Sequence, residues 1–159
     1  MKKTHSIFNH PLFVQSMRKN ELSEINRPYC KHDLAHAIDV ARIAYVINLE
    51  DQLGFSKETI YATALLHDIT KWEQHLSDIP HNQSAIEPAT KILQDVEFSE
   101  EEIANICYAI LHHKDGPPDT TGFAYLIFRA DKLSRACYSC DSKSSCYWED
   151  SKKNTLLKY

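Results

Sequence analysis

Apolar residues recur at three- and four-residue steps through almost every segment of this chain, and no stretch alternates apolar and polar residues with a period of two. That spacing places apolar side chains along one face of an α-helix. A chain of 159 residues has the length of one domain that can bury a core. We therefore predict an all-α fold, a single compact bundle of about six helices.

Local signals mark the ends of the expected helices. Pro11 is tolerated in a first turn, Asp33 and Ser56 can cap the helices that follow them, and Ser99 forms a capping-box pattern with Glu102. The expected helices cover residues 11–25, 33–52, 56–70, 84–96, 99–114 and 122–133. The polar segment 71–83 is predicted to be an irregular connection. We expect residues 1–136 to form the helical domain and residues 137–159 a Cys-rich tail packed on it.

The charge balance argues against several partners. Eighteen Lys and Arg against 22 Asp and Glu give a net charge of −4, and the basic clusters are short pairs, so we expect no nucleic-acid partner. No run of apolar residues is long enough for a membrane span, and the first residues lack the pattern of a signal peptide. We therefore expect a cytoplasmic protein that has no membrane partner. A homodimer is one option for its oligomeric state.

Histidine is unusually frequent, with nine residues in the chain. Imidazole nitrogens and carboxylate oxygens together suit a transition-metal ion. His32 and His36 are four residues apart and share a helix face, whereas His5, His10 and His75 are predicted to be ordinary hydrogen-bonded residues. The candidate ligands or neighbours of a metal are His32, His36, His67, Asp68, His81, His112, His113 and Asp131.

The order of these residues resembles a known family. His36 in KHDLAHAIDVARIA, His67-Asp68 in ATALLHDITK and Asp131 in YLIFRADKLSR resemble the H…HD…D signature of the HD-domain superfamily of metal-dependent phosphohydrolases. The resemblance covers about residues 28–136. It implies a helical core in which these four residues hold one ion.

Further histidines resemble the second-metal ligands of two-metal branches of this superfamily. His81 lies in PHNQSA, and the HHKDG segment offers either His112 or His113. The HHKDG segment resembles that of bacterial HD-type dinucleoside-tetraphosphate hydrolases most closely if His113 is the ligand, whereas both adjacent histidines ligate in some cyclic-dinucleotide phosphodiesterases. The resemblance implies two ions, with Fe, Mn, Ni, Co or Zn as candidates and Mg as a further option.

The implied activity is hydrolysis of a small phosphoester, a nucleotide or a dinucleoside polyphosphate. Asp68 would bridge the ions, and a metal-activated hydroxide would attack phosphorus. Lys71 would add positive charge at the phosphate, His32 would be a neighbour of the ligands or a proton shuttle, and Arg135 would grip a substrate phosphate. A solvated Lys71 is an equal alternative.

Two other functions fit the same residues. One is a regulatory module that binds a metal or nucleotide without turnover, with a tail that responds to redox or metal state. The other is an oxygen-using diiron enzyme of the HD type. A complete ligand set together with Lys71 favours the hydrolase.

The chain has five cysteines, and a reducing compartment makes a disulfide framework unexpected. Cys137, Cys140 and Cys146 follow a C-x2-C-x5-C pattern, which favours a thiolate metal site. If the tail folds back toward Cys30, these four residues form a tetrathiolate site for structural Zn or an iron–sulfur cluster. Free thiols are the alternative. Cys107 lies on an apolar helix stripe and is predicted to be part of the core.

Overall fold

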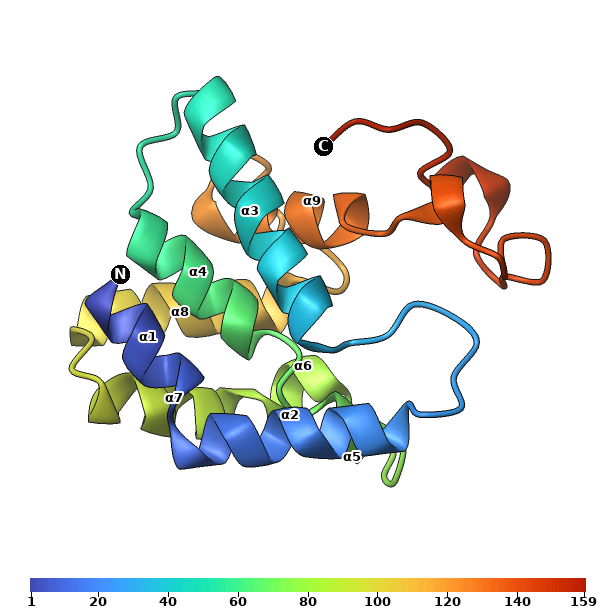
Figure 1. Ribbon diagram of the computed structural model, residues 1–159. Helices are drawn as coiled ribbons and strands as arrows, with labels where there is room; N and C mark the ends of the chain where they lie inside the picture. Colours follow the sequence, from blue (N-terminus) through green and yellow to red (C-terminus); the bar gives the residue numbers. More distant parts are fainter.

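The computed structural model describes residues 1–159 and contains helices and no strand, which confirms the all-α fold (Figure 1). Its α-helices are α1 (Lys2–Phe8), α2 (Pro11–Ser23), α3 (Leu34–Glu50), α4 (Lys57–Leu66), α5 (Lys71–Gln74), α6 (His81–Ser84), α7 (Ile86–Asp95), α8 (Glu100–His112) and α9 (Phe123–Leu133). Two 3-10 turns, η1 (Cys137–Ser139) and η2 (Asp150–Lys152), follow. None of the helices is long and apolar enough to cross a membrane.

Side-chain caps fix where three of the long helices begin. Asp33 accepts a hydrogen bond from the backbone N–H of His36, and Ser56 accepts one from that of Thr59. Ser99 and Glu102 form the expected capping box at the start of α8. Each of these bonds satisfies a backbone donor that the first turn of a helix leaves free, so the local sequence sets these boundaries.

The segment 71–83 differs from the prediction of an irregular connection. It contains the short helix α5, and α6 begins at His81. Ser84 belongs to α6 and does not cap the following helix, because α7 begins after Ala85 without a side-chain cap. Helices of one turn have almost no apolar periodicity, so tertiary contacts rather than pattern set their positions.

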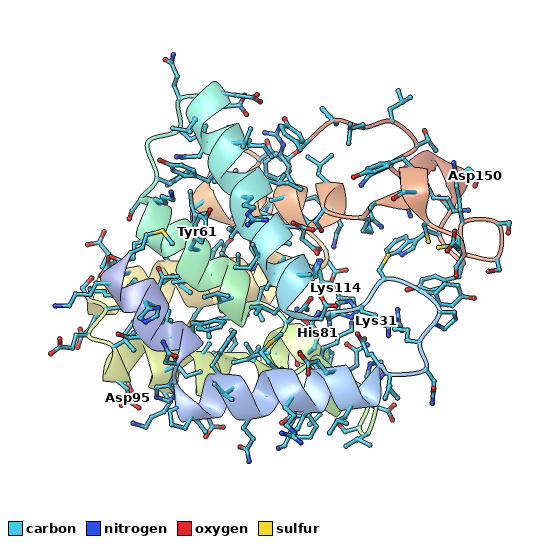
Figure 2. All side chains as sticks on the ribbon, in the orientation of Figure 1. Lys31, Tyr61, His81, Asp95, Lys114 and Asp150 are labelled. Carbon is cyan, nitrogen blue, oxygen red and sulfur yellow. The ribbon has the colours of Figure 1, made fainter.

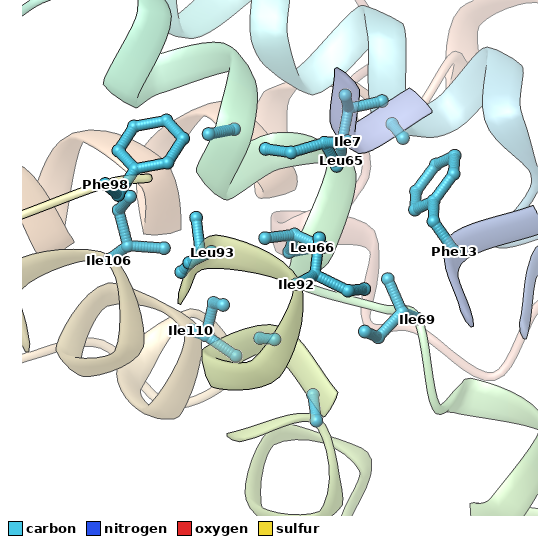
Figure 3. Packing of buried hydrophobic residues seen from close by; sticks show 14 of the residues in the cluster. Ile7, Phe13, Leu65, Leu66, Ile69, Ile92, Leu93, Phe98, Ile106 and Ile110 are labelled. Atoms are coloured by element: carbon cyan, nitrogen blue, oxygen red, sulfur yellow. The ribbon is translucent and has the colours of Figure 1, made fainter. Parts of the chain in front are cut away.

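The core has two apolar clusters. In one, residues of α4, α7 and α8 pack with α1 and α2, as Figure 3 shows for Leu66, Ile92 and Ile110. In the other, α3 packs against α4 and α9 through small and branched residues such as Ala44 and Ile127. These clusters hold the ends of α3, α4, α8 and α9 in fixed relation, which is where the polar cluster described below is found.

The C-terminal segment lies beside the loop between α2 and α3. In Figure 1 the orange-to-red chain after α9 and the blue loop before α3 extend on the same side of the bundle. Ser142 Oγ donates to the carbonyl of Pro28 at 2.6 Å, and Tyr29 Oη donates to that of Ser145 at 3.2 Å. Asn154 Nδ2 donates to carbonyls of Lys132, Leu133 and Arg135, which fixes the tail to the end of α9.

Candidate metal centre

Five segments bring six histidine and aspartate side chains to one place. His36 lies in the first turn of α3, His67 and Asp68 follow the last residue of α4, and Asp131 lies in α9. His81 is the first residue of α6, and His113 follows the last residue of α8. Because four of these positions are at or beside helix ends, side chains from different helices can reach one centre.

The first group of ligand atoms surrounds one oxygen of Asp68. Asp68 Oδ2 lies 3.1 Å from His67 Nε2 and 3.4 Å from His36 Nε2. The Nε2 atoms of His36 and His67 are 3.2 Å apart, and Asp131 Oδ1 is 3.4 Å from His36 Nε2. His36, His67 and Asp68 thus meet the spacing that a single metal ion requires.

The second group surrounds the other oxygen of the same carboxylate. Asp68 Oδ1 lies 3.0 Å from His81 Nε2 and 3.4 Å from His113 Nε2, and these two nitrogens are 3.0 Å apart. Asp68, His81 and His113 are all buried and form a second triad of metal-ion spacing. One carboxylate therefore contributes an oxygen to each of two triads.

The hydrogen bonding of this cluster fits a bound cation. Asp68 Oδ1 is buried and receives no hydrogen bond of acceptable geometry, although His81 Nε2 is within 3.0 Å. A buried, unpaired carboxylate oxygen is costly in a protein interior. Nitrogen lone pairs and carboxylate oxygens that face each other are the donor set that a divalent metal ion satisfies.

A second set of contacts orients the histidines. The Nδ1 atoms of His67 and His113 donate to the carbonyls of Ala64 at 2.7 Å and Ile110 at 2.6 Å. His36 Nδ1 lies 3.3 Å from Ser134 Oγ. Partners on Nδ1 leave Nε2 as the coordinating atom, which is the usual arrangement around metal-binding histidines. For His81, the partner on Nδ1 is Gln74 Oε1.

The electrostatics of the cluster favour positive charge at its centre. Burial opposes protonation of His36, yet hydrogen bonds to Asp131 and Asp68 raise the pKa of His36 to about 10. Burial raises the pKa values of Asp68 and Asp131, but the surrounding histidines, with Lys132 beside Asp131, hold both well below the usual range. Both carboxylates are therefore ionised, which is the state that binds metal.

His81 differs from His36 in this respect. Its burial and the positive charge of Lys71 lower the pKa of His81 to about 4, despite the nearby Asp68 carboxylate. A neutral imidazole is the form that coordinates a metal ion, so His81 is ready to bind at neutral pH.

The cluster lies at the base of a cavity of about 770 Å³. Figure 2 shows Lys31, His81 and Lys114 gathered near the first turn of α3, and all three line this cavity. The basic side chains that line it are Arg27, Lys31, Lys71, Lys114, Lys132, Arg135 and Lys152. A chain of net charge −4 thus has a cavity rich in positive charge, which favours an anionic ligand.

The other predicted residues have different positions relative to the cluster. Lys71 Nζ lies 3.3 Å from His81 Nδ1, and His32 and Arg135 line the cavity. Arg135 also lies over the ring of Trp148, at 4.6 Å. His112 does not join the cluster, because its ring packs on Tyr108 at 4.4 Å. Of the adjacent pair, only His113 faces Asp68.

Several residues of the site carried no recognisable sequence signal. Glu24 is buried after α2 and bonds His32, and Lys132 Nζ donates to Asp131 Oδ2 at 2.6 Å. Asn20 donates through Nδ2 to the carbonyl of Asp68 at 2.8 Å and accepts from the backbone N–H of Trp72. The four-residue spacing of Asn20 and Glu24 places both on one face, but this spacing alone does not indicate that they contact the site.

The cysteines also separate into two groups. Cys30, Cys137, Cys140 and Cys146 line one small cavity, whereas Cys107 lies on α8 beside Thr90, in contact with the core. Partial burial raises the pKa of the Cys30 thiol above its ordinary value, and the sulfurs of the three tail cysteines add to this effect. All five are free thiols in this structure.

Comparison with known proteins finds relatives of this chain. The chain is 45% identical over 159 residues, all of both chains, to a protein of Clostridium beijerinckii (strain ATCC 51743 / NCIMB 8052) described as "Uncharacterized protein". It is 33% identical over 108 residues to ribonuclease Y 1 of Pediococcus pentosaceus, which is 68% of this chain and 19% of that protein. The chain thus spans about a fifth of that relative's length.

Among solved structures, that of a predicted HD superfamily hydrolase from an uncultured Thermotogales bacterium is similar in fold. Its TM-score is 0.63 at 22% identity, and the match covers 88% of this chain and 80% of that chain. The HD domain family matches residues 33–136, which contain all six residues of the histidine and aspartate cluster. The chain belongs to the HD-domain family.

Proposed function

We propose that this protein is a metal-dependent phosphohydrolase that cleaves a small phosphoester, nucleotide or dinucleoside polyphosphate. The observation that carries the proposal is Asp68, whose two carboxylate oxygens each face a separate triad of ligand atoms. Such a carboxylate is suited to bridge two ions. Membership of the HD-domain family supports the same conclusion.

The residues that would hold metal are His36, His67, Asp68 and Asp131 on one side and Asp68, His81 and His113 on the other. Ions such as Mn, Fe, Co, Ni, Zn or Mg held there would supply Lewis acidity, which lowers the pKa of water and neutralises charge on a phosphoryl group. The set of four histidine nitrogens with two carboxylates favours a transition metal over Mg.

The chain's own basic residues would bind the phosphate. Lys71 and Lys132 lie beside the cluster, since their Nζ atoms contact His81 Nδ1 at 3.3 Å and Asp131 Oδ2 at 2.6 Å. Arg135 is one turn beyond Asp131, and its buried Nη1 has no hydrogen-bond partner. Arg135 lines the basic cavity, and a guanidinium that turns toward a bound phosphate can donate to two of its oxygens at once.

His32 is placed to move a proton. Its backbone N–H and its Nδ1 both contact the Glu24 carboxylate, each at 2.7 Å, while its ring lies edge-on to that of His36 at 5.7 Å. The Glu24 contact holds the proton on Nδ1, so Nε2 is the atom left for the cavity. There, His32 can accept a proton from water or give one to a leaving group.

The aromatic wall of the cavity favours a nucleotide over a simple phosphoester. Phe128, Tyr147 and Trp148 line the same cavity as the basic residues. Rings of this kind provide stacking surfaces for a base. Ribonuclease Y 1 is named for cleavage of RNA, so a phosphodiester belongs in the substrate screen.

The test is a screen for product release from nucleotides, dinucleoside polyphosphates and short RNA, with Mn, Fe, Co, Ni, Zn or Mg added. Asp68→Asn removes the bridging charge while keeping the size of the side chain, and Asp95→Asn, at an exposed pair with Lys91, is the matched control. We expect turnover in the wild type and the control, and a loss of at least about 100-fold in Asp68→Asn.

Turnover that survives Asp68→Asn would overturn the assignment of this site. Metal binding by the wild type without turnover of any of these substrates would favour a regulatory binding module. Turnover that requires oxygen would favour a diiron oxygenase, so the screen includes an anaerobic arm.

A further inference from the structure

Four of the five cysteines surround one small cavity that is separate from the histidine cluster. The cavity has a volume of about 20 Å³, and Cys30, Cys137, Cys140 and Cys146 are among its lining residues. Cys30 comes from the loop before α3, and the other three come from the tail after α9. Cysteines more than a hundred positions apart in sequence thus line one pocket.

The local spacing of the tail cysteines suits metal ligation. Cys137 begins the turn η1 and Cys140 follows its last residue, so the C-x2-C pair lies across one tight turn. Two ligands at that spacing can reach a single ion. Cys146 follows a second turn, in which the N–H of Ser145 bonds the carbonyl of Ser142.

The tail has almost no core of its own. Between residues 137 and 159 only Cys137 is buried among the apolar residues, while Tyr138, Tyr147 and Leu156 are exposed. What holds it to the loop before α3 is a few polar contacts, such as Ser142 to Pro28 and Arg27 to Tyr147, and the edge-on contact of the Tyr29 and Tyr147 rings. A segment with so little buried apolar area needs another source of stability.

Two lysines provide the charge that a thiolate site requires. Four thiols that bind Zn²⁺ release four protons, which leaves a centre of net charge −2. Lys143 and Lys153 both line the cysteine cavity, and the side chain of Lys153 is only 8% exposed. Lys153 Nζ donates to the carbonyl of Lys143 at 3.1 Å, which brings the two lysines together beside the sulfurs. Their positive charges would offset part of the charge of a tetrathiolate centre, since Lys153 Nζ is also paired with Asp150 Oδ1 at 2.9 Å.

We propose that Cys30, Cys137, Cys140 and Cys146 bind one structural Zn²⁺ that fastens the C-terminal tail to the loop before α3. The cavity has room for a single ion rather than an iron–sulfur cluster. The cysteines form no triad as tight as those of the histidine cluster, and Cys30 is exposed at the edge of the pocket. Binding would therefore draw the tail cysteines closer to one another as well as Cys30 toward the tail, and would close the pocket.

The proposed site would also shape the large basic cavity. Tyr147, Trp148, Lys152 and Asn154 belong to the tail and line that cavity, and Trp148 lines both cavities. A Zn²⁺ ion that fixes the tail would fix this wall. The ion would act on substrate affinity without touching the reacting atoms.

Replacement of the native metal by Co²⁺ tests the site directly. Thiolate ligands give a sulfur-to-cobalt charge-transfer band in the near ultraviolet, whereas the histidine and aspartate cluster contains no thiolate. We expect about one equivalent of Co²⁺ to produce this band in the wild-type protein. Asp68→Asn should retain the band, while Cys140→Ser should lose it.

Cys107→Ala is the matched control, because Cys107 lies on α8 away from the pocket. It should keep both the band and the Zn content. In the wild type, a thiol reagent should find four cysteines protected until a chelator is added, and the tail should then become sensitive to protease. This second readout needs no variant, so it holds even if Cys140→Ser fails to fold.

Four results would overturn the proposal. Three are the absence of a thiolate band at saturating Co²⁺, the recovery of iron with inorganic sulfide on the purified chain, and a mass lower by two hydrogens that shows a disulfide. The fourth is Zn content that is unchanged by Cys140→Ser but lost in Asp68→Asn, which would place the ion in the histidine cluster alone.

Discussion

Glu24 Oε1 lies 2.7 Å from His32 Nδ1, and the Glu24 side chain is only 2% exposed. The same oxygen is 3.2 Å from His75 Nε2, so one buried carboxylate contacts two imidazoles. This arrangement fixes the ring of His32 at the edge of the basic cavity. It connects α2, which contributes no proposed metal ligand, to the chemistry of the site.

Glu24→Gln should slow turnover while metal content stays unchanged. The amide no longer fixes the proton of His32 on Nδ1, so we expect kcat to fall roughly 10- to 100-fold. Glu21→Gln, at an exposed position in the last turn of α2, is the control and should retain wild-type turnover. The pH–rate profile should also change in Glu24→Gln, and an unaltered profile would mean that His32 does not transfer the proton.

The stability of the protein should depend on Glu24 below neutral pH. Burial opposes ionisation of this carboxyl, but its bonds to His32 lower the pKa of Glu24 from 4.5 to about 2. A depressed carboxyl pKa stabilises the fold above the unfolded value, and this contribution is lost as the pH falls from about 4.5 toward about 2. We expect it to be roughly 2–3 kcal/mol.

Urea unfolding of the wild type and Glu24→Gln between about pH 6 and about pH 2.5 measures this contribution. The difference in the free energy of unfolding should be largest at the upper end and should shrink toward the lower end. Parallel curves across the whole range would contradict the prediction.

His112 and His113 should differ sharply in metal binding. His113 Nε2 lies 3.4 Å from Asp68 Oδ1, whereas the His112 ring packs on Tyr108. His113→Ala should therefore lose about one metal ion per chain and most of its turnover, while His112→Ala should retain both. Elemental analysis after dialysis measures the metal, and equal losses in the two variants would contradict the structural assignment.

Arg135→Ala should weaken substrate binding more than it slows the chemical step. Its guanidinium lines the basic cavity, and a charged hydrogen bond to phosphate contributes about 1.5–3 kcal/mol. We expect KM to rise at least about 10-fold, with a weaker dependence on salt than in the wild type. Arg129→Ala, at a surface pair with Asp51, is the control. A rise in KM of the same size in both variants would show a general effect of charge.

The pattern of the sequence determined the all-α fold and most helix boundaries. Helix periodicity and caps such as Asp33 and Ser99 act over three or four residues, so they can be read locally. The order His36, His67-Asp68 and Asp131 resembles the signature of the HD-domain family, and this resemblance, rather than the spacing, indicated the family and implied the main ligand set. The short helices α1, α5 and α6 were missed.

Only the tertiary structure decided which side chains complete the site. The choice of His113 over His112 depends on how α8 ends against Asp68, since adjacent residues on a helix diverge by roughly 100°. The bond from Glu24 to His32 and the meeting of the tail with the loop at Cys30 depend on contacts between segments far apart in the chain. Sequence spacing sets local geometry, whereas packing brings distant segments together, and so these parts of the site could not be read from the sequence alone.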